Sequence, residues 1–228
     1  MRYQKIKKAI FLERPNRFIA NVELDGATEV CHVKNTGRCR ELLVPGRTVF
    51  IEQSDNPNRK TKYDLIAADK DGLLINMDSQ APNKVAVEWI EQGGIYKKED
   101  IVLIKPEKKY RNSRFDIYVE SRQEKAFIEV KGVTLERDGV AAFPDAPTER
   151  GLKHIYELID CAKHGYKAYI LFVIQLKGAK YFIPNDNTQP EFHKALKEAE
   201  TEGVKILAYE CEVEPDLLKI TEPVEVRL

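Results

Sequence analysis

The sequence predicts an all-β unit at residues 1–80 followed by an α/β unit at residues 81–228. Three observations lead to this fold class. Before residue 80, short apolar and β-branched segments alternate with turn dipeptides such as Asp-Gly and Pro-Gly. After residue 82, apolar residues recur at helical spacing. Two continuous apolar runs in the same region are typical of strands that are buried on both faces.

The first unit is expected to contain strands and no major helix. Segment Cys39–Leu43 is long enough for one helical turn only. Many short strands joined by tight turns favour a small closed barrel, and about five strands suit an OB-like barrel. The expected strands lie at residues 6–16, 17–24, 28–33, 48–54, 63–70 and 73–79.

The second unit is expected to follow the order helix, three strands, helix, strand, helix, strand, which is that of a layered α/β domain. Gly93-Gly94 ends the first helix, and Thr148 is placed to cap the second. The expected helices lie at residues 83–92, 148–161 and 190–202, and the expected strands at residues 100–107, 114–121, 125–135, 167–176 and 204–213.

Overall composition gives no general argument for a nucleic-acid partner. Lys and Arg number 37 and Asp and Glu also number 37, so any such argument depends on where the charges lie. No apolar stretch approaches the roughly 18 residues of a membrane span. The four cysteines form no C-x-x-C pair, which favours reduced thiols in an intracellular protein.

Three residues in two neighbouring strands form a candidate catalytic and metal-binding group. Glu129 and Lys131 are two residues apart in Phe-Ile-Glu-Val-Lys, so both side chains lie on one face of their strand. If the preceding strand forms a hairpin with it, Asp116 lies across from Glu129. Two carboxylates offer hard oxygen ligands to Mg²⁺ or Mn²⁺. A nearby lysine can hold a water molecule or stabilise charge on a phosphate.

The same pattern has a purely structural interpretation. Glu-x-Lys is common on the solvent face of any strand, where it forms a weak ion pair. The preceding helix supplies a further candidate acid, Glu88, with Glu91 as second choice, and either can simply be a solvated helix residue. The Asp, Glu and Lys together are typical of nucleases of the PD-(D/E)xK type, although the pattern alone is loose.

The first unit carries a group of cationic and amide side chains near its turns. Because the turns of a small barrel converge, these groups are expected to form one basic face for phosphates, with Phe18 and Tyr63 available for stacking. The alternative is that each is solvated. The candidate nucleic-acid-binding residues are Arg14, Asn16, Arg17, Lys34, Asn35, Arg38, Arg59 and Lys60, with Arg40 and Lys62 beside them.

Four residues outside these groups have a structural interpretation. Pro144-Asp145 is interpreted as a loop turn, and His154 as a surface residue of its helix. Gln175 either touches the edge of the site or merely ends a strand.

Several motifs resemble the sugar fermentation stimulation protein A family. They include Arg-Pro-Asn-Arg-Phe (14–18), Asn-Thr-Gly-Arg (35–38), Ser-Arg-Phe-Asp (113–116), Glu-Val-Lys-Gly-Val-Thr-Leu (129–135) and Phe-Pro-Asp-Ala-Pro-Thr-Glu-Arg-Gly-Leu-Lys-His (143–154). The resemblance covers nearly the whole chain. Cys39 stands where the family suggests methionine, which is an apolar exchange.

This resemblance implies an N-terminal OB-type barrel, a PD-(D/E)xK domain with its triad at Asp116, Glu129 and Lys131, DNA binding and a cytoplasmic location. Two functions remain open. One is a metal-dependent nuclease that cleaves phosphodiester bonds. The other is a DNA-binding regulator of sugar (maltose) metabolism genes that performs no catalysis. The intact triad favours the first, and the family's regulatory association favours the second.

Overall fold

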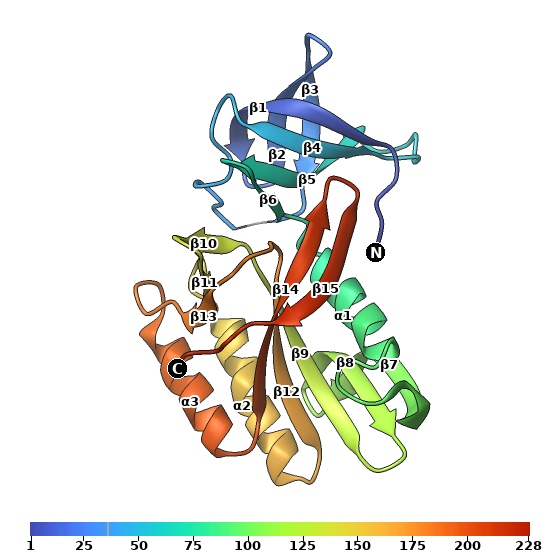
Figure 1. The fold of residues 1–228 in the computed structure, drawn as a ribbon, viewed down its shortest axis with the longest axis vertical. Helices are drawn as coiled ribbons and strands as arrows, with labels where there is room; N and C mark the ends of the chain where they lie inside the picture. Colours follow the sequence, from blue (N-terminus) through green and yellow to red (C-terminus); the bar gives the residue numbers. More distant parts are fainter. Residues whose placement is uncertain (36) are drawn as a thin grey trace.

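Six strands of the first unit form one sheet that curls into a closed barrel (Figure 1). The structure is a computed structural model that describes residues 1–35 and 37–228. The strand order is β3-β2-β1-β4-β5-β6, and a parallel pairing of β3 with β5 closes the sheet, so the predicted OB-like barrel is confirmed. The strands are β1 (Ile6–Asn16), β2 (Ile19–Leu24), β3 (Ala27–Val33), β4 (Thr48–Gln53), β5 (Tyr63–Lys70) and β6 (Leu73–Asn76).

Local sequence explains the barrel strands and their connections. In β2, Ala20, Val22 and Leu24 are buried while the residues between them are not, which is the two-residue period of a strand with one face on a core. The β2–β3 turn has φ values of 53° at Asp25 and 80° at Gly26. Two successive positive φ values define a type I′ turn, whose twist matches that of a hairpin.

The second unit is built on a mixed six-stranded sheet in the order β15-β14-β12-β9-β8-β7. β9, β12 and β14 are mutually parallel neighbours, whereas β7, β8 and β15 run antiparallel to their partners. The short 3-10 helix η1 (Lys98–Asp100) leads into β7. The strands are β7 (Ile101–Tyr110), β8 (Ser113–Ser121), β9 (Lys125–Val133), β12 (Lys167–Ile174), β14 (Lys205–Glu214) and β15 (Leu217–Pro223).

Three helices cover the two faces of this sheet (Figure 1). α1 (Ala81–Glu91) buries Val85 and Ile90 in one apolar cluster. α2 (Glu149–Lys163) and α3 (Pro190–Thr201) contribute to the cluster on the opposite face. The hydroxyl of Thr148 accepts a hydrogen bond from the backbone N–H of Gly151 at 2.9 Å, as expected of the helix cap. None of the helices in the described ranges is long and apolar enough to cross a membrane.

Four strands of the second unit were not expected. β10 (Leu135–Arg137), β11 (Val140–Phe143) and β13 (Tyr181–Pro184) form a small separate sheet. Strands of three or four residues are too short to show a period in the sequence. The strand expected at 204–213 corresponds to β14. It is not the last strand, because β15 follows it and pairs with it in antiparallel orientation.

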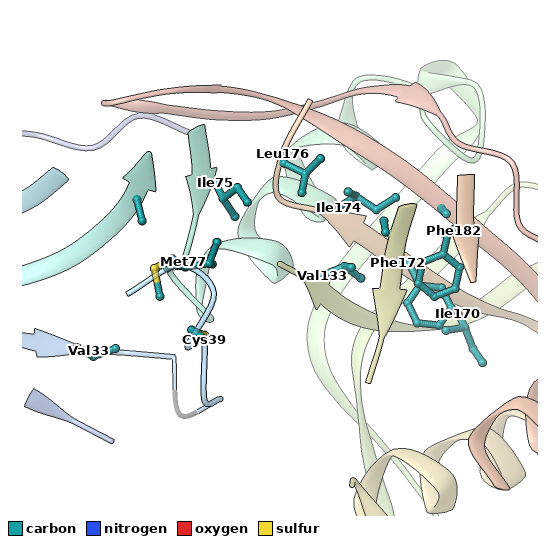
Figure 2. Packing of buried hydrophobic residues seen from close by; sticks show 14 of the residues in the cluster. Val33, Cys39, Ile75, Met77, Val133, Ile170, Phe172, Ile174, Leu176 and Phe182 are labelled. Carbon is teal, nitrogen blue, oxygen red and sulfur yellow. The ribbon is translucent and has the colours of Figure 1, made fainter. Parts of the chain in front are cut away.

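The barrel and the α/β unit share one apolar cluster across their junction (Figure 2). Ile75 and Met77 come from the end of the barrel, and Ile174 and Leu176 come from the end of β12 and the residues after it. A 2.5 Å ion pair between Lys70 of β5 and Glu136 of β10 also connects the two units. The continuous core therefore holds the barrel against the carboxyl ends of β9 and β12.

Candidate metal and nucleic-acid site

Asp116 lies where strands β8 and β9 part. Their ladder ends at the pair Ile117–Ile128. Beyond it, Oδ2 of Asp116 accepts a hydrogen bond from the backbone N–H of Val130 at 2.8 Å, in the place of a strand partner. Oδ1 accepts from Nδ2 of Asn83 in α1 at 2.9 Å. Two elements therefore fix this carboxylate, and Asn83 is a residue that sequence reasoning missed.

Glu129 and Lys131 share a face of β9, as the strand period predicts. Nζ of Lys131 donates to Oε1 of Glu129 at 2.5 Å. Glu129 is 3% exposed, and its Oε2 is buried with no hydrogen-bond partner among the described residues. An unpartnered buried carboxylate oxygen is costly unless something positive meets it. Oε2 of Glu129 is therefore available to coordinate a cation.

His154 also belongs to this site, and its expected place on the helix surface was wrong. Its side chain is 5% exposed, and Nδ1 donates to Oε1 of Glu129. Oε1 of Glu129 thus accepts hydrogen bonds from both His154 and Lys131. The sequence held a signal for this, because His154 is four residues before the buried Leu158 and beside the buried Ile155, on the apolar side of α2.

The two carboxylates of the site affect each other's ionisation. Burial, followed by the negative charge of Glu129, raises the pKa of Asp116. Burial also opposes ionisation of Glu129, but the hydrogen bonds from His154 and Lys131 outweigh it and hold the pKa of Glu129 below its usual value. Two ionised carboxylates that repel each other in a buried place are stabilised by a cation between them.

The side chains present fit a divalent cation bound partly through water. No group of three or more His, Cys, Asp and Glu side chains that could hold a metal occurs in the described part of the chain. Asp116 and Glu129 alone would therefore leave positions for water or substrate oxygens. Mg²⁺ commonly keeps several waters and is bound by one or two carboxylates together with phosphate oxygens.

Glu88 lines the same open groove as Asp116. The groove has a volume of about 530 Å³ and lies between α1 and the β7–β8 pair, with Asn83, Val87 and Pro106 also in its wall. The carboxylate of Glu88 accepts from the N-terminal ammonium of Met1 at 2.7 Å. Glu88 therefore lines the groove, but its carboxylate forms an ion pair with the N-terminal ammonium of Met1. The second candidate, Glu91, lines a different hollow beside β7.

Three of the predicted phosphate-binding cations make contacts within the protein. The Arg14 guanidinium donates to the backbone carbonyls of Arg17, Asn35, Gly37 and Arg38 at 2.7 to 2.9 Å, so it organises the loops around it.

Arg59 and Lys34 face buried carboxylates. Arg59 donates to both oxygens of Asp64 at 2.5 and 2.8 Å. Lys34 donates to Asp78 at 2.9 Å. Both cations thus neutralise buried carboxylates of the protein.

The remaining basic residues lie on the barrel surface. Arg17 stacks over the ring of Phe18 at 4.7 Å, and Phe18 is 44% exposed, so this pair is open to a base. Tyr63 is 1% exposed, so the expectation that it stacks on bases was wrong, because it begins β5 with its ring in the core. Asn35 is half-buried beside the domain junction. The exposed polar residues of the group are Asn16, Arg17, Arg38, Arg40, Lys60 and Lys62.

Comparison with known proteins agrees with both halves of the fold. A family model described as the SfsA N-terminal OB domain matches residues 12–77, and one described as the sugar fermentation stimulation protein RE domain matches residues 80–217. The sugar fermentation stimulation protein homologue of Ruminiclostridium cellulolyticum is 60% identical over 228 residues, covering 100% of both chains. That of Clostridium beijerinckii is 58% identical over the same coverage.

A solved structure shows the same architecture over the whole length. The structure of Pyrococcus furiosus SfsA in complex with Ca²⁺ is 30% identical, covers 100% of this chain and 98% of its own, and superposes with a TM-score of 0.90. The barrel and the α/β domain are thus arranged as in that structure. The chain belongs to the sugar fermentation stimulation protein (SfsA) family.

Proposed function

We propose that this protein is a metal-dependent nuclease, in which residues 1–80 bind DNA and residues 81–228 cleave phosphodiester bonds with Mg²⁺ or Mn²⁺. The observation that carries the proposal is the unpartnered, buried Oε2 of Glu129 in the same site as Asp116 and Lys131. The related P. furiosus protein is described in complex with Ca²⁺, which supports a divalent cation in this family.

Each residue of the site has a distinct task in this proposal. Asp116 and Glu129 would hold the cation, and Asn83 and His154 keep the two carboxylates in place. A bound divalent cation lowers the pKa of water and stabilises negative charge on a phosphate. Lys131, which is only part-buried, can turn from Glu129 toward an incoming phosphate and stabilise the charge that develops there.

The barrel would supply the affinity for the nucleic-acid backbone. Exposed Arg17, Arg38 and Lys60 can contact phosphates, and the Arg17–Phe18 pair offers a surface on which a base can stack. Arg14, Lys34 and Arg59 would act indirectly, by fixing the loops that present these groups.

The direct test is cleavage of single-stranded, double-stranded and branched DNA by the purified protein with Mg²⁺ or Mn²⁺. We expect cleavage that a chelator stops and that Asp116→Asn abolishes. Binding to the same DNA should persist in that variant. Binding without cleavage under every condition would replace the nuclease with a non-catalytic DNA-binding regulator.

A further inference from the structure

The groove between α1 and the β7–β8 pair has the size of part of one DNA strand. Its volume of about 530 Å³ lies within the range of about 300–1,000 Å³ that is usual for sites of small organic ligands. A single nucleotide is a ligand of that kind. A base pair consists of two nucleotides within a continuous double helix, so the groove suits one strand better than two.

The two site residues on β9 lie below the protein surface. Glu129 is 3% exposed, and the side chain of Lys131 is 16% exposed. Asp116 lines the open groove. A phosphate that meets a cation bound to Asp116 therefore has a neighbouring nucleotide in the groove.

The groove offers one exposed cation, and its acids outside the site are paired. Lys84 of α1 is exposed and forms no ion pair with an acid in the described part of the chain. Glu88 pairs with the ammonium of Met1 at 2.7 Å, and Glu107 pairs with Arg114 at 3.0 Å. Lys84 is thus available to a phosphate, and the paired carboxylates repel that phosphate less than free ones would.

Apolar surfaces in the groove and on the barrel match nucleotides whose bases are unpaired. Val87 of α1 and Pro106 of β7 line the groove and can pack against a sugar or the face of a base. On the barrel, Phe18 is 44% exposed beside the guanidinium of Arg17. Aromatic side chains bind single strands by stacking on their bases, whereas neighbouring base pairs cover the faces of the bases inside a duplex.

We propose that the DNA enters the site as one unpaired strand, with the nucleotide next to the scissile phosphate in this groove and the phosphate of that nucleotide against Lys84. The inference rests on the proposed nuclease function and names the class of its substrate. Single-stranded DNA and the unpaired arm of a branched DNA fit the groove directly. Duplex DNA must first lose pairing and stacking, which costs free energy for each nucleotide that leaves the helix.

Binding of one strand in its free and paired forms tests the substrate class. The free form is a single strand of about 16 nucleotides, the upper site size of one OB-type barrel, and the paired form is the same strand in a blunt duplex. Ca²⁺ is present at saturation, and denaturing gels confirm that the DNA is intact when the affinity is read. We expect the single strand to bind at least about tenfold more tightly than the duplex.

Two lysine variants place the strand in this groove. Lys84→Ala should weaken binding of the single strand about fivefold, the upper end for an exposed ion pair. It should also reduce the slope of log affinity against log salt by about 0.7, the value for one phosphate contact of a single strand. Lys98→Ala is the matched control and should bind nearly as the wild type does, since Lys98 is an exposed lysine that lines the other hollow, beside β7. Thermal unfolding checks that both variants fold.

The outcomes separate this inference from the proposed function. Equal affinity for the single strand and the duplex would overturn the inference and leave the nuclease proposal intact. Equal affinities and salt slopes of Lys84→Ala and Lys98→Ala would overturn the placement of the strand in this groove. Failure of the wild type to bind either DNA would remove the proposed function together with the inference.

Discussion

The imidazole of His154 holds the carboxylate of Glu129 by one oxygen. Nδ1 of His154 donates to Oε1, while Oε2 has no hydrogen-bond partner within the described residues. A carboxylate fixed at one oxygen presents the other in a defined direction. Residues that orient metal ligands in this way contribute strongly to metal affinity although they do not touch the metal.

His154→Ala should therefore weaken Mg²⁺ or Mn²⁺ binding by about 10- to 100-fold, the usual cost of losing such a partner. Titration calorimetry measures this without any need for catalysis. His164→Ala, at the exposed end of the same helix, is the control and should bind metal as the wild type does. Unchanged affinity in His154→Ala would show that His154 only fills space.

Lys131→Ala should leave DNA affinity nearly intact and reduce turnover by about a hundred-fold to a thousand-fold, because one group that stabilises transition-state charge is typically worth that much. Cleavage and binding are measured on the same preparations. Lys125→Ala is a matched control, since Lys125 lies on the same strand and pairs only with Glu120 at 3.6 Å among the described acids. Equal losses of rate in the two variants would contradict a specific role for Lys131.

Asp116→Asn removes a buried charge, which favours folding of the metal-free protein near neutral pH, but it also loses one hydrogen bond, because the new amide can accept from only one of Asn83 and Val130. The gain from the removed charge is the part that depends on pH. Burial and the charge of Glu129 raise the pKa of Asp116, so its ionised form opposes folding. The cost that ionised Asp116 adds to folding is fully present above its pKa in the folded protein. It disappears as the pH falls below its pKa in the unfolded chain, which is about 3.9. The gain from the removed charge should shrink over the same range. Added Mg²⁺ should stabilise the wild type and not the variant, and unfolding curves across pH test both points.

Arg59→Ala should lower the free energy of unfolding by about 1–3 kcal/mol, the cost of removing a hydrogen-bond partner from a buried charged group, because the carboxylate of Asp64 then keeps only His32 and Lys34 beside it. Its partner Asp64 is 5% exposed, and the hydrogen bond from Arg59 offsets burial and holds the pKa of Asp64 low. Because this folded pKa is depressed, the stability from the pair is present above the unfolded pKa and is lost as pH falls through the folded pKa.

Lys60→Ala is the matched control for Arg59, since it removes a neighbouring exposed cation. Denaturant unfolding should show little change in stability for Lys60→Ala, while its DNA affinity falls. A similar loss of stability in both variants would contradict the structural role that we assign to Arg59.

DNA affinity should fall with salt, with a slope of about 0.7–0.9 per phosphate contact in a plot of log affinity against log salt. Arg38 is exposed, so Arg38→Ala should reduce this slope by about one contact and weaken binding to all DNA sequences alike. Fluorescence anisotropy at several salt concentrations measures the slope. A loss confined to one sequence would argue against a phosphate contact.

Much of the fold and part of the site were accessible from the sequence because their causes are local. Turn residues and the two-residue period located the barrel strands, and the cap at Thr148 located α2. The same period placed Glu129 and Lys131 on one face of β9, where their side chains meet. These features depend on residues close together in the chain, so one sequence is enough to predict them.

Only the tertiary structure showed which charged and polar side chains have hydrogen-bond partners within the protein and which remain exposed for a ligand. Arg14, Lys34 and Arg59 have the same cationic character in the sequence as Arg38, yet they are bound to carbonyls and carboxylates of the protein. Asn83 and His154 approach the site from helices 33 and 25 residues away from their partners. A side chain's partner depends on long-range packing, which the order of residue types does not encode locally. A cavity lined by Asn35 and Gln175 has the same origin, because Asn35 belongs to the first unit and Gln175 follows β12 of the second.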